Sequence, residues 1–123
     1  MSGLKLGKGQ MRIMQVLWEK KKATALEITD AINNIEPIKH STVQTFLRIL
    51  ERKNAVAHDV DKRTFIYYPL LKDSKVKTHV LQDLIDTVFA GSPEGMISYL
   101  IKNIEISPEQ LIKIKELLDK KEK

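Results

Sequence analysis

The segment from Ala23 to Tyr68 constrains the fold more than any other part of the chain. It holds two short amphipathic helical patterns joined by a tight connection, and two β-rich runs follow around the basic tip Asp61-Lys62-Arg63. Two short helices followed by a hairpin is the order of a winged helix-turn-helix. We therefore expect a mainly α fold with a small β-hairpin wing.

Helix signals precede and open this segment. Apolar residues recur at helical spacing from Leu6 to Lys20, and the basic run that begins at Lys20 favours a helix C-terminus because it complements the helix dipole. A second helix should start at Thr24, since Thr24 and Glu27 have the spacing of a capping box. Its expected buried residues are Ile28, Ala31 and Ile32.

A third helix is predicted from Ser41 to Lys53, with Ser41 and Gln44 as a second capping box. This helix has two faces. The apolar face consists of Val43, Phe46, Leu47 and Leu50, and the polar face of Ser41, Gln44, Thr45, Arg48 and Arg52. A helix that lies in a DNA groove needs both an apolar face against its own core and a polar face outward.

The wing is predicted to begin directly after the third helix. Asn54 tolerates the left-handed conformation that ends many helices, so a strand can follow at once. The runs Ala55–Val60 and Thr64–Pro69 are rich in β-branched and aromatic residues, as hairpin strands are. Tyr67 is expected to pack inside rather than to contact a ligand.

Residues 72–123 contain only helical patterns. Two helix starts, at Ser92-Pro93 and Ser107-Pro108, place serine at the cap and proline at the first helical position. Helices of this length expose more apolar surface than they bury alone, which favours a paired arm in a homodimer. The alternative is that they pack back on the first part of the chain. We expect residues 1–71 to form the winged domain and residues 72–123 a helical dimerisation region.

The charge distribution favours a polyanionic partner. The net charge is +5. Residues 1–71 hold 12 Lys and Arg against 7 Asp and Glu, whereas residues 72–123 hold 9 of each, so the whole excess lies in the first part. Basic residues near phosphates gain affinity by releasing counterions, although a merely solvated surface is the alternative. The sequence has no apolar run of the ~18 residues that span a bilayer, and a cytoplasmic location is expected.

Catalysis and metal binding find little support in the sequence. His40 lies beside Ser41 and His58 beside Asp59, but neither pair has a third residue at a spacing that would orient the histidine for acid-base or nucleophilic chemistry. The chain is therefore not expected to be an enzyme. The three histidines, the third being His79, fall on three predicted elements, and cysteine is absent. No metal or cofactor is therefore expected. His58 and His79 are interpreted as surface residues.

The motifs taken together resemble the BlaI/MecI/CopY family of bacterial repressors. They cover nearly the whole chain and read Leu6-x-x-x-Gln10-x-x-Ile13-Met14-x-x-Leu17-Trp18, Thr24-Ala25-x-Glu27-Ile28, Ser41-Thr42-Val43-Gln44-Thr45-x-Leu47-x-Ile49-Leu50-x-x-Lys53, Arg63-x-x-x-Tyr67-x-Pro69 and Phe89-x-Gly91-Ser92. The resemblance implies a homodimer with an N-terminal winged helix and a C-terminal helical arm. It also implies repression at operators of inverted-repeat form.

Two branches of the family differ in how they are induced. The copper-responsive branch uses a cysteine-rich site, which a chain without cysteine excludes. In the β-lactam branch a protease cuts an Asn-Phe bond in the second helix of the arm, and by position this corresponds to Tyr99-Leu100. The resemblance thus implies an inactivating protease as a further partner, although the residue pair differs here.

The expected function is sequence-specific binding to double-stranded DNA. The N-terminal part of the second helix in a helix-turn-helix reaches base edges, which makes Thr42, Gln44, Thr45 and Arg48 the candidates for readout. Lys39, His40 and Ser41 are expected nearer phosphates, with a base contact as the alternative for His40. Lys62 and Arg63 should reach the flanking backbone or minor groove. Winged helices also serve as protein-interaction scaffolds, which remains the alternative, and a small-molecule sensor would need a pocket that the sequence does not indicate.

Overall fold

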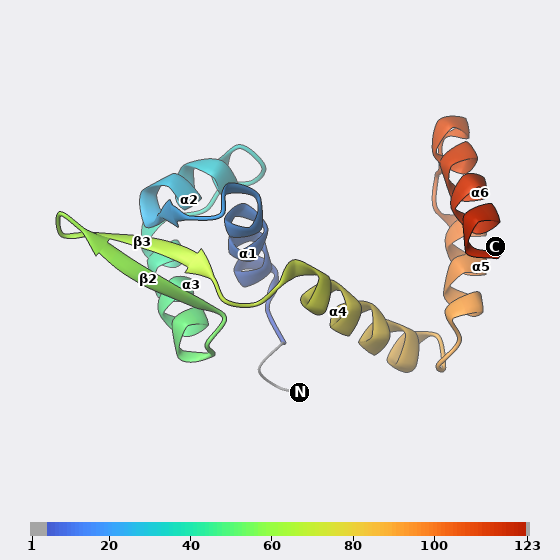
Figure 1. Cartoon of the computed structure of the whole chain (residues 1–123), viewed down its shortest axis with the longest axis horizontal. Helices are drawn as coiled ribbons and strands as arrows, with labels where there is room; N and C mark the ends of the chain where they lie inside the picture. Colours follow the sequence, from blue (N-terminus) through green and yellow to red (C-terminus); the bar gives the residue numbers. More distant parts are fainter. Residues whose placement is uncertain (1–4, 123) are drawn as a thin grey trace. The chain divides into compact units, whose positions relative to one another are not determined.

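A computed structural model describes residues 5–122, and these form six helices and three strands (Figure 1). The elements are α1 (Lys8–Lys20), β1 (Ala23–Thr24), α2 (Ala25–Asn33), α3 (His40–Arg52), β2 (Val56–Asp61), β3 (Thr64–Pro69), α4 (Asp73–Val88), α5 (Pro93–Asn103) and α6 (Pro108–Glu122). The chain divides into two compact units between Leu81 and Gln82, inside α4. The expected mainly α fold with a small hairpin wing is confirmed.

The predicted start of α2 is confirmed at Thr24. Its hydroxyl accepts a hydrogen bond from the backbone N–H of Glu27 at 3.1 Å, and the Glu27 carboxylate accepts one from the Thr24 N–H at 2.8 Å. This reciprocal pair satisfies two backbone donors that a helix N-terminus leaves without partners. These bonds also lower the pKa of the Glu27 carboxyl below its usual value.

The predicted capping box at Ser41 is wrong. Helix α3 begins at His40, and Lys39 is its N-cap residue, with an extended backbone and no side-chain capping bond. The connection from α2 is held instead by Asn33, whose Oδ1 accepts a hydrogen bond from the Ile38 N–H at 2.9 Å. Ser41 therefore lies inside the first turn, and Gln44 is not used as a cap.

The end of α3 is closed by Asn54, as the sequence predicts. Asn54 has a φ of 61°, its N–H donates to the Glu51 carbonyl at 3.0 Å, and the Ala55 N–H donates to the Leu50 carbonyl at 2.9 Å. This is the Schellman arrangement, with asparagine in the left-handed position. The chain can therefore turn directly into β2.

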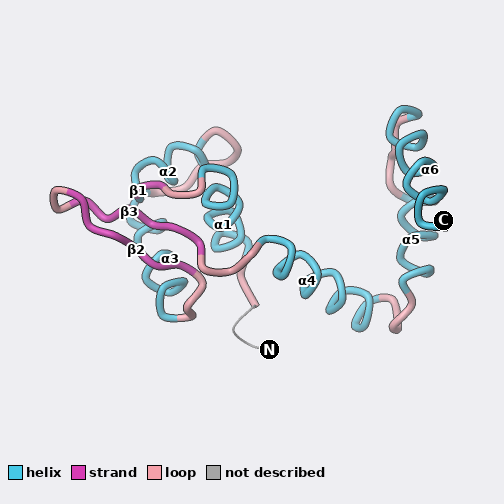
Figure 2. Tube along the Cα trace, in the orientation of Figure 1, coloured by secondary structure: helices cyan, strands magenta, loops and turns pink. Residues whose placement is uncertain are grey.

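The sheet has three antiparallel strands in the order β1-β3-β2 (Figure 2). The sequence did not predict β1, which pairs Ala23 with Tyr67 and Thr24 with Ile66. On the other side of β3, the β2 register runs from Asp61 opposite Thr64 back to Val56 opposite Pro69, with His58 opposite Tyr67. Strand β3 is therefore central, and the sheet holds the start of α2 as well as the hairpin.

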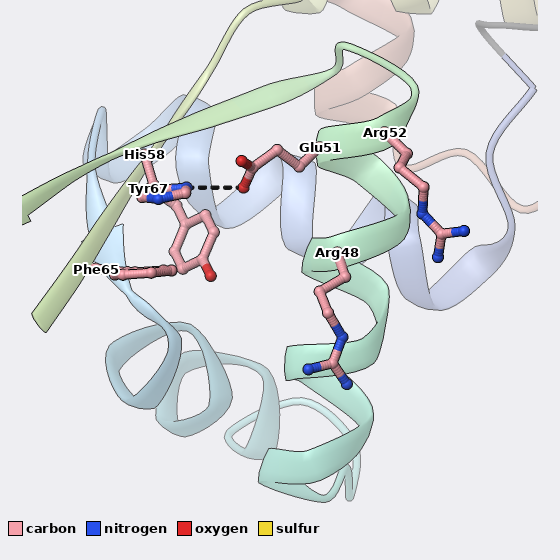
Figure 3. A pocket seen from close by; sticks show the side chains of 6 residues that line it. All are labelled: Arg48, Glu51, Arg52, His58, Phe65 and Tyr67. Atoms are coloured by element: carbon pink, nitrogen blue, oxygen red, sulfur yellow. Dashed lines mark hydrogen bonds and ion pairs between the residues drawn. The ribbon is translucent and has the colours of Figure 1, made fainter.

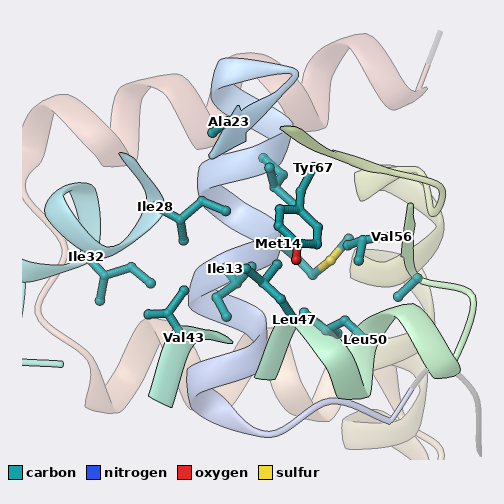
Figure 4. Close-up of a cluster of buried hydrophobic side chains, with 12 residues drawn as sticks. Ile13, Met14, Ala23, Ile28, Ile32, Val43, Leu47, Leu50, Val56 and Tyr67 are labelled. Carbon is teal, nitrogen blue, oxygen red and sulfur yellow. The ribbon is translucent and has the colours of Figure 1, made fainter. Parts of the chain in front are cut away.

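One apolar core lies between α1, α2, α3 and the sheet (Figure 4). Its buried residues are Ile13, Met14, Leu17, Ala23, Ile28, Ile32, Val43, Leu47, Leu50, Ala55, Val56 and Tyr67. The spacing of Val43, Leu47 and Leu50 turns one face of α3 inward, as predicted. Phe46, expected in the same stripe, packs only partly against the core.

One further expectation about the core needs correction. Ala31 of α2 is only half-buried, and the polar Thr29 is buried in its place, with 5 % of its surface exposed.

Gly9 of α1 faces the Phe46 ring of α3 so closely that a Cβ there would lie 2.3 Å from a ring carbon. Glycine at this position lets α1 approach α3.

The second unit, residues 82–123, contains the rest of α4 with α5 and α6. Helix α5 starts as predicted, with the Ser92 hydroxyl accepting from the Gly95 N–H at 2.9 Å. Ser107 and Gln110 form the reciprocal pair of a capping box at the start of α6. Among the described residues of α5 and α6 no side chain is buried.

Candidate nucleic-acid interface

Helix α3 presents a continuous polar face to solvent. Ser41, Gln44, Thr45, Arg48 and Arg52 are all exposed, while Thr42 is half-buried. The opposite face holds the buried Val43, Leu47 and Leu50. The structure thus separates the two faces as the sequence predicts, and the polar face is free of the chain's own core.

Arg48 is oriented by its own helix. Its Nη2 donates to the Thr45 hydroxyl at 3.4 Å, and that hydroxyl donates to the Ser41 carbonyl at 3.0 Å. Figure 3 shows Arg48 and Arg52 projecting from α3, with Arg52 directed away from His58 and Tyr67. Gln44 is exposed, so its amide is accessible to a ligand.

The start of α3 brings together residues from α2 and α3. Lys39 and His40 are exposed, and the His40 Nδ1 lies 3.2 Å from the hydroxyl oxygen of Thr29. Beside them an open groove of about 410 Å³ is lined by Thr24, Ala25, Leu26, His40, Gln44, Arg63, Thr64, Phe65 and Tyr67. The groove therefore joins the predicted helix contacts His40 and Gln44 to the predicted wing contact Arg63.

The wing tip is a strained two-residue turn. Lys62 and Arg63 have φ values of 50° and 69°, and the paired residues Asp61 and Thr64 flank them. Positive φ at both central positions is the requirement of a type I′ turn, in which Asn-Gly is the favoured pair. Two exposed basic residues hold these positions instead. Strain kept at exposed positions is typical of functional sites.

The wing is joined to the last turn of α3 by a contact that the sequence did not indicate. The His58 Nδ1 lies 2.8 Å from a Glu51 carboxylate oxygen, and the His58 ring stacks on Phe65 with centroids 4.0 Å apart. The interpretation of His58 as a surface residue is therefore wrong, since only 23 % of its side chain is exposed. His79, read in the same way, is half-buried.

A second open cavity, of about 560 Å³, lies over this contact (Figure 3). It is lined by Arg48, Glu51, Arg52, His58, Phe65 and Tyr67. Tyr67 has 9 % of its surface exposed, which agrees with the expectation that it packs inside. Burial, reinforced by the charge of Glu51, raises the pKa of the Tyr67 hydroxyl above its usual value, so the hydroxyl stays protonated at neutral pH.

The remaining predicted site lies in the second unit. Tyr99 and Leu100 are exposed residues of α5, and the Tyr99 ring meets the Phe89 ring edge to face at 6.0 Å.

Among residues 5–122 no three His, Asp or Glu side chains converge as metal ligands would. No helix of the described chain is both long and apolar enough to cross a membrane.

Comparison with known proteins identifies relatives over almost the full length. The chain is 22 % identical over 116 residues to the methicillin resistance regulatory protein MecI of Staphylococcus aureus strain N315, a match that covers 94 % of each chain. It is 23 % identical over 113 residues to the penicillinase repressor of Bacillus licheniformis, covering 89 % of this chain and 86 % of that one.

A solved structure shares the fold of part of the chain. The solution structure of the DNA-binding domain of the repressor BlaI matches with a TM-score of 0.52 and 24 % identity, covering 57 % of this chain and 85 % of that domain. The model of the family described as penicillinase repressor matches residues 6–120. The chain therefore belongs to the penicillinase repressor family, whose members are transcriptional repressors and not enzymes.

Proposed function

We propose that this repressor binds DNA in a sequence-specific manner, as a homodimer on an operator of inverted-repeat form. The observation that carries the proposal is the exposed polar face of α3, which lies opposite the buried Val43, Leu47 and Leu50 and beside a basic wing tip. The BlaI domain that shares this fold is described as DNA-binding, which supports the same role here.

Base readout is assigned to the middle of the exposed face. Arginine pairs best with guanine and glutamine with adenine, so Arg48 and Gln44 are the main candidates. Thr45 supports Arg48 through the 3.4 Å hydrogen bond and can itself contact a base edge. Thr42, which is half-buried, is the weakest of the four readout candidates.

Phosphate contacts are assigned to both ends of the interface. Lys39 is the N-cap residue of α3 and Ser41 lies in its first turn, where backbone N–H groups and the positive end of the helix dipole favour an anion. Lys62 and Arg63 at the wing tip extend the contact to the flanking backbone or minor groove. These contacts supply affinity for any sequence and make binding depend on salt.

The homodimer is assigned to the second unit. Large apolar side chains of α5 and α6 are 41–65 % exposed: Ile97, Tyr99, Leu100, Ile101, Leu111, Ile112, Leu117 and Leu118. An apolar surface on this scale marks an interaction site, and a second copy of the same helices would bury it. Two DNA-binding units joined in this way would make the second DNA contact intramolecular.

An inactivating protease acting between Tyr99 and Leu100 is part of the same proposal. Both side chains are exposed in α5, and the bond between them separates Phe89 and its partner Tyr99 from all of α6. A cut there would divide the proposed dimer surface. Incubation of the repressor with the cognate inactivating protease tests this step, and an intact 99–100 region would contradict it.

The proposed function is tested by selecting bound duplexes from a random pool with the full chain. The expected result is an inverted repeat, bound by two chains per duplex as measured by sedimentation, with affinity that falls as salt rises. Failure to bind any duplex at low salt would favour the alternative of a protein-interaction scaffold.

A further inference from the structure

A buried threonine of α2 touches the first residue of α3. The Thr29 hydroxyl oxygen lies 2.8 Å from the Ala25 carbonyl oxygen and 3.2 Å from the His40 Nδ1. Thr29 has 5 % of its surface exposed, whereas His40 is exposed at the start of the proposed DNA-reading helix. The contact therefore links the interior of the helix-turn-helix to its outer face.

The number of protons on the Thr29 hydroxyl decides which of the two groups, Thr29 or His40, donates the hydrogen bond between them. A hydroxyl has one proton to donate and two lone pairs to accept. The distance of 2.8 Å to the Ala25 carbonyl is the ordinary length of an O–H···O bond, so the Thr29 proton lies there. The hydroxyl must then accept from His40, which requires a proton on Nδ1.

In the neutral ring, a proton on Nδ1 makes the other ring nitrogen, Nε2, a hydrogen-bond acceptor. In a neutral imidazole one nitrogen donates and the other accepts, so the Nε2 of His40 carries a lone pair. A lone pair repels a phosphate oxygen, whereas it accepts a hydrogen bond from an amino group. In the major groove such donors are the N6 amino group of adenine and the N4 amino group of cytosine.

We infer that Thr29 is a positioning residue that fixes a proton on the Nδ1 of His40, so that in the neutral ring Nε2 accepts a hydrogen bond from a base amino group. His40 thereby becomes a specificity-determining residue rather than a phosphate contact. Its place supports this, because His40 lines the same groove as Gln44, one helical turn further along α3. The inference rests on the proposed DNA-binding function.

The tautomer is tested on the free full-length protein by ¹⁵N NMR of the imidazole rings, at a pH where titration shows His40 to be neutral. His40 is assigned by the loss of its signals in His40→Asn. The expected spectrum has a protonated Nδ1 and an unprotonated Nε2. A wild-type His40 with the proton on Nε2 would overturn the inference, and this readout needs no DNA.

The role of Thr29 is tested with Thr29→Val, which keeps the side-chain shape but removes the hydroxyl. The NMR spectrum should move towards the Nε2–H form, and preference for an A·T or C·G pair at one position of each half-site should fall about 3- to 10-fold, the value of one hydrogen bond. Affinity for random duplexes should stay within about twofold of the wild type. Thr29→Ser, which retains the hydroxyl, should restore the preference.

A matched control is available in α4. The Thr87 hydroxyl makes the same bond to the carbonyl four residues earlier, Asp83, at 2.7 Å, and both residues lie in the second compact unit. Thr87→Val should leave the base preference unchanged. Equal losses on selected and random duplexes for Thr29→Val, or no loss on either, would contradict the inference.

The NMR result separates two kinds of failure. If the wild type selects no sequence from the pool, the proposed function is wrong and the readout role of His40 falls with it, whatever the tautomer. If the wild type selects a sequence but carries its proton on Nε2, only the inference about Thr29 and His40 is wrong. If Thr29→Val does not fold, as judged by circular dichroism, the wild-type spectrum still decides.

Discussion

His58 on β2 and Glu51 in the last turn of α3 are joined by a 2.8 Å contact, which attaches the wing to the proposed DNA-reading helix. The His58 ring also stacks on Phe65 of β3 at an interplanar angle of 11°. The position of the wing tip relative to α3 therefore depends on a side-chain pair as well as on the sheet.

His58→Ala is predicted to loosen the wing. It removes one hydrogen bond and one ring stack, so the free energy of unfolding should fall by about 1–2 kcal/mol, and the amides of β2 should exchange faster with solvent. Denaturant unfolding and hydrogen exchange measure both effects. The control is Asp59→Ala, an exposed neighbour on the same strand, which should change stability by less than about 0.5 kcal/mol. Equal losses for the two variants would contradict this account of the wing.

Lys62 and Arg63 at the wing tip are predicted to lower the stability of the fold and to raise its affinity for DNA. Replacing Lys62 and Arg63 by Asn-Gly, the pair best suited to a type I′ turn, should raise the free energy of unfolding by about 1 kcal/mol. It should also lower affinity for all duplexes alike and reduce the salt slope by about two. Lys21→Gly is the control, since it relieves a φ of 75° and removes a charge at the end of α1, outside the proposed interface. Unchanged DNA affinity in the Asn-Gly variant would exclude the wing from the interface.

Acid should weaken an ion pair that holds α1 to the loop after α2. A hydrogen bond from Arg12, then the charge of Lys8, lowers the pKa of Glu36 below 4.5. A lowered folded-state pKa stabilises the fold above the unfolded value, and this stabilisation is lost as pH falls through the folded pKa. Glu36→Gln and Arg12→Ala should therefore lose less stability than the wild type when pH falls below 4.5. Urea unfolding at neutral pH and at about pH 3 measures this, and parallel pH profiles for all three proteins would contradict it.

A fragment that ends at Leu81 should fold but lose the advantage of two DNA contacts. It retains the whole first compact unit, including the bond from the Trp18 indole N–H to the Leu71 carbonyl at 2.9 Å and the buried Val76. The full chain should prefer a duplex with two half-sites over one with a single half-site by a factor of about 10² or more. The fragment should show almost no such preference. If it matched the full chain, the dimer proposal would be wrong.

Local rules explain which parts of the fold could be predicted. Thr24 begins α2 and Asn54 ends α3, and each does so through hydrogen bonds to residues only a few positions away, as the sequence predicts. The Ser41 signal fails because a Ser-x-x-Gln spacing also occurs inside helices, and Asn33 already holds the incoming loop. Strand β1 has two residues, too few to show any periodicity, and forms because β3 offers a free edge.

The His58–Glu51 contact shows what sequence reasoning on the site could have found. Once the two-residue turn at Lys62-Arg63 is accepted, counting back along the hairpin places His58 opposite Tyr67. That register puts His58 beside buried residues rather than on the surface. The approach of Glu51 depends on how the hairpin packs on α3, which no local pattern in the sequence records. The Thr29–His40 contact depends in the same way on the packing of α2 and α3.

The most direct test of the account is the specificity of Arg48→Ala. The measured quantity is the ratio of affinities for the selected duplex and for a scrambled duplex, at one salt concentration. We predict that Arg48→Ala lowers this ratio about 5- to 150-fold, which corresponds to about 1–3 kcal/mol, whereas Arg52→Ala, one turn away on the same face, leaves it unchanged. If Arg48→Ala instead weakened both duplexes equally, the exposed face of α3 would not be reading bases through Arg48.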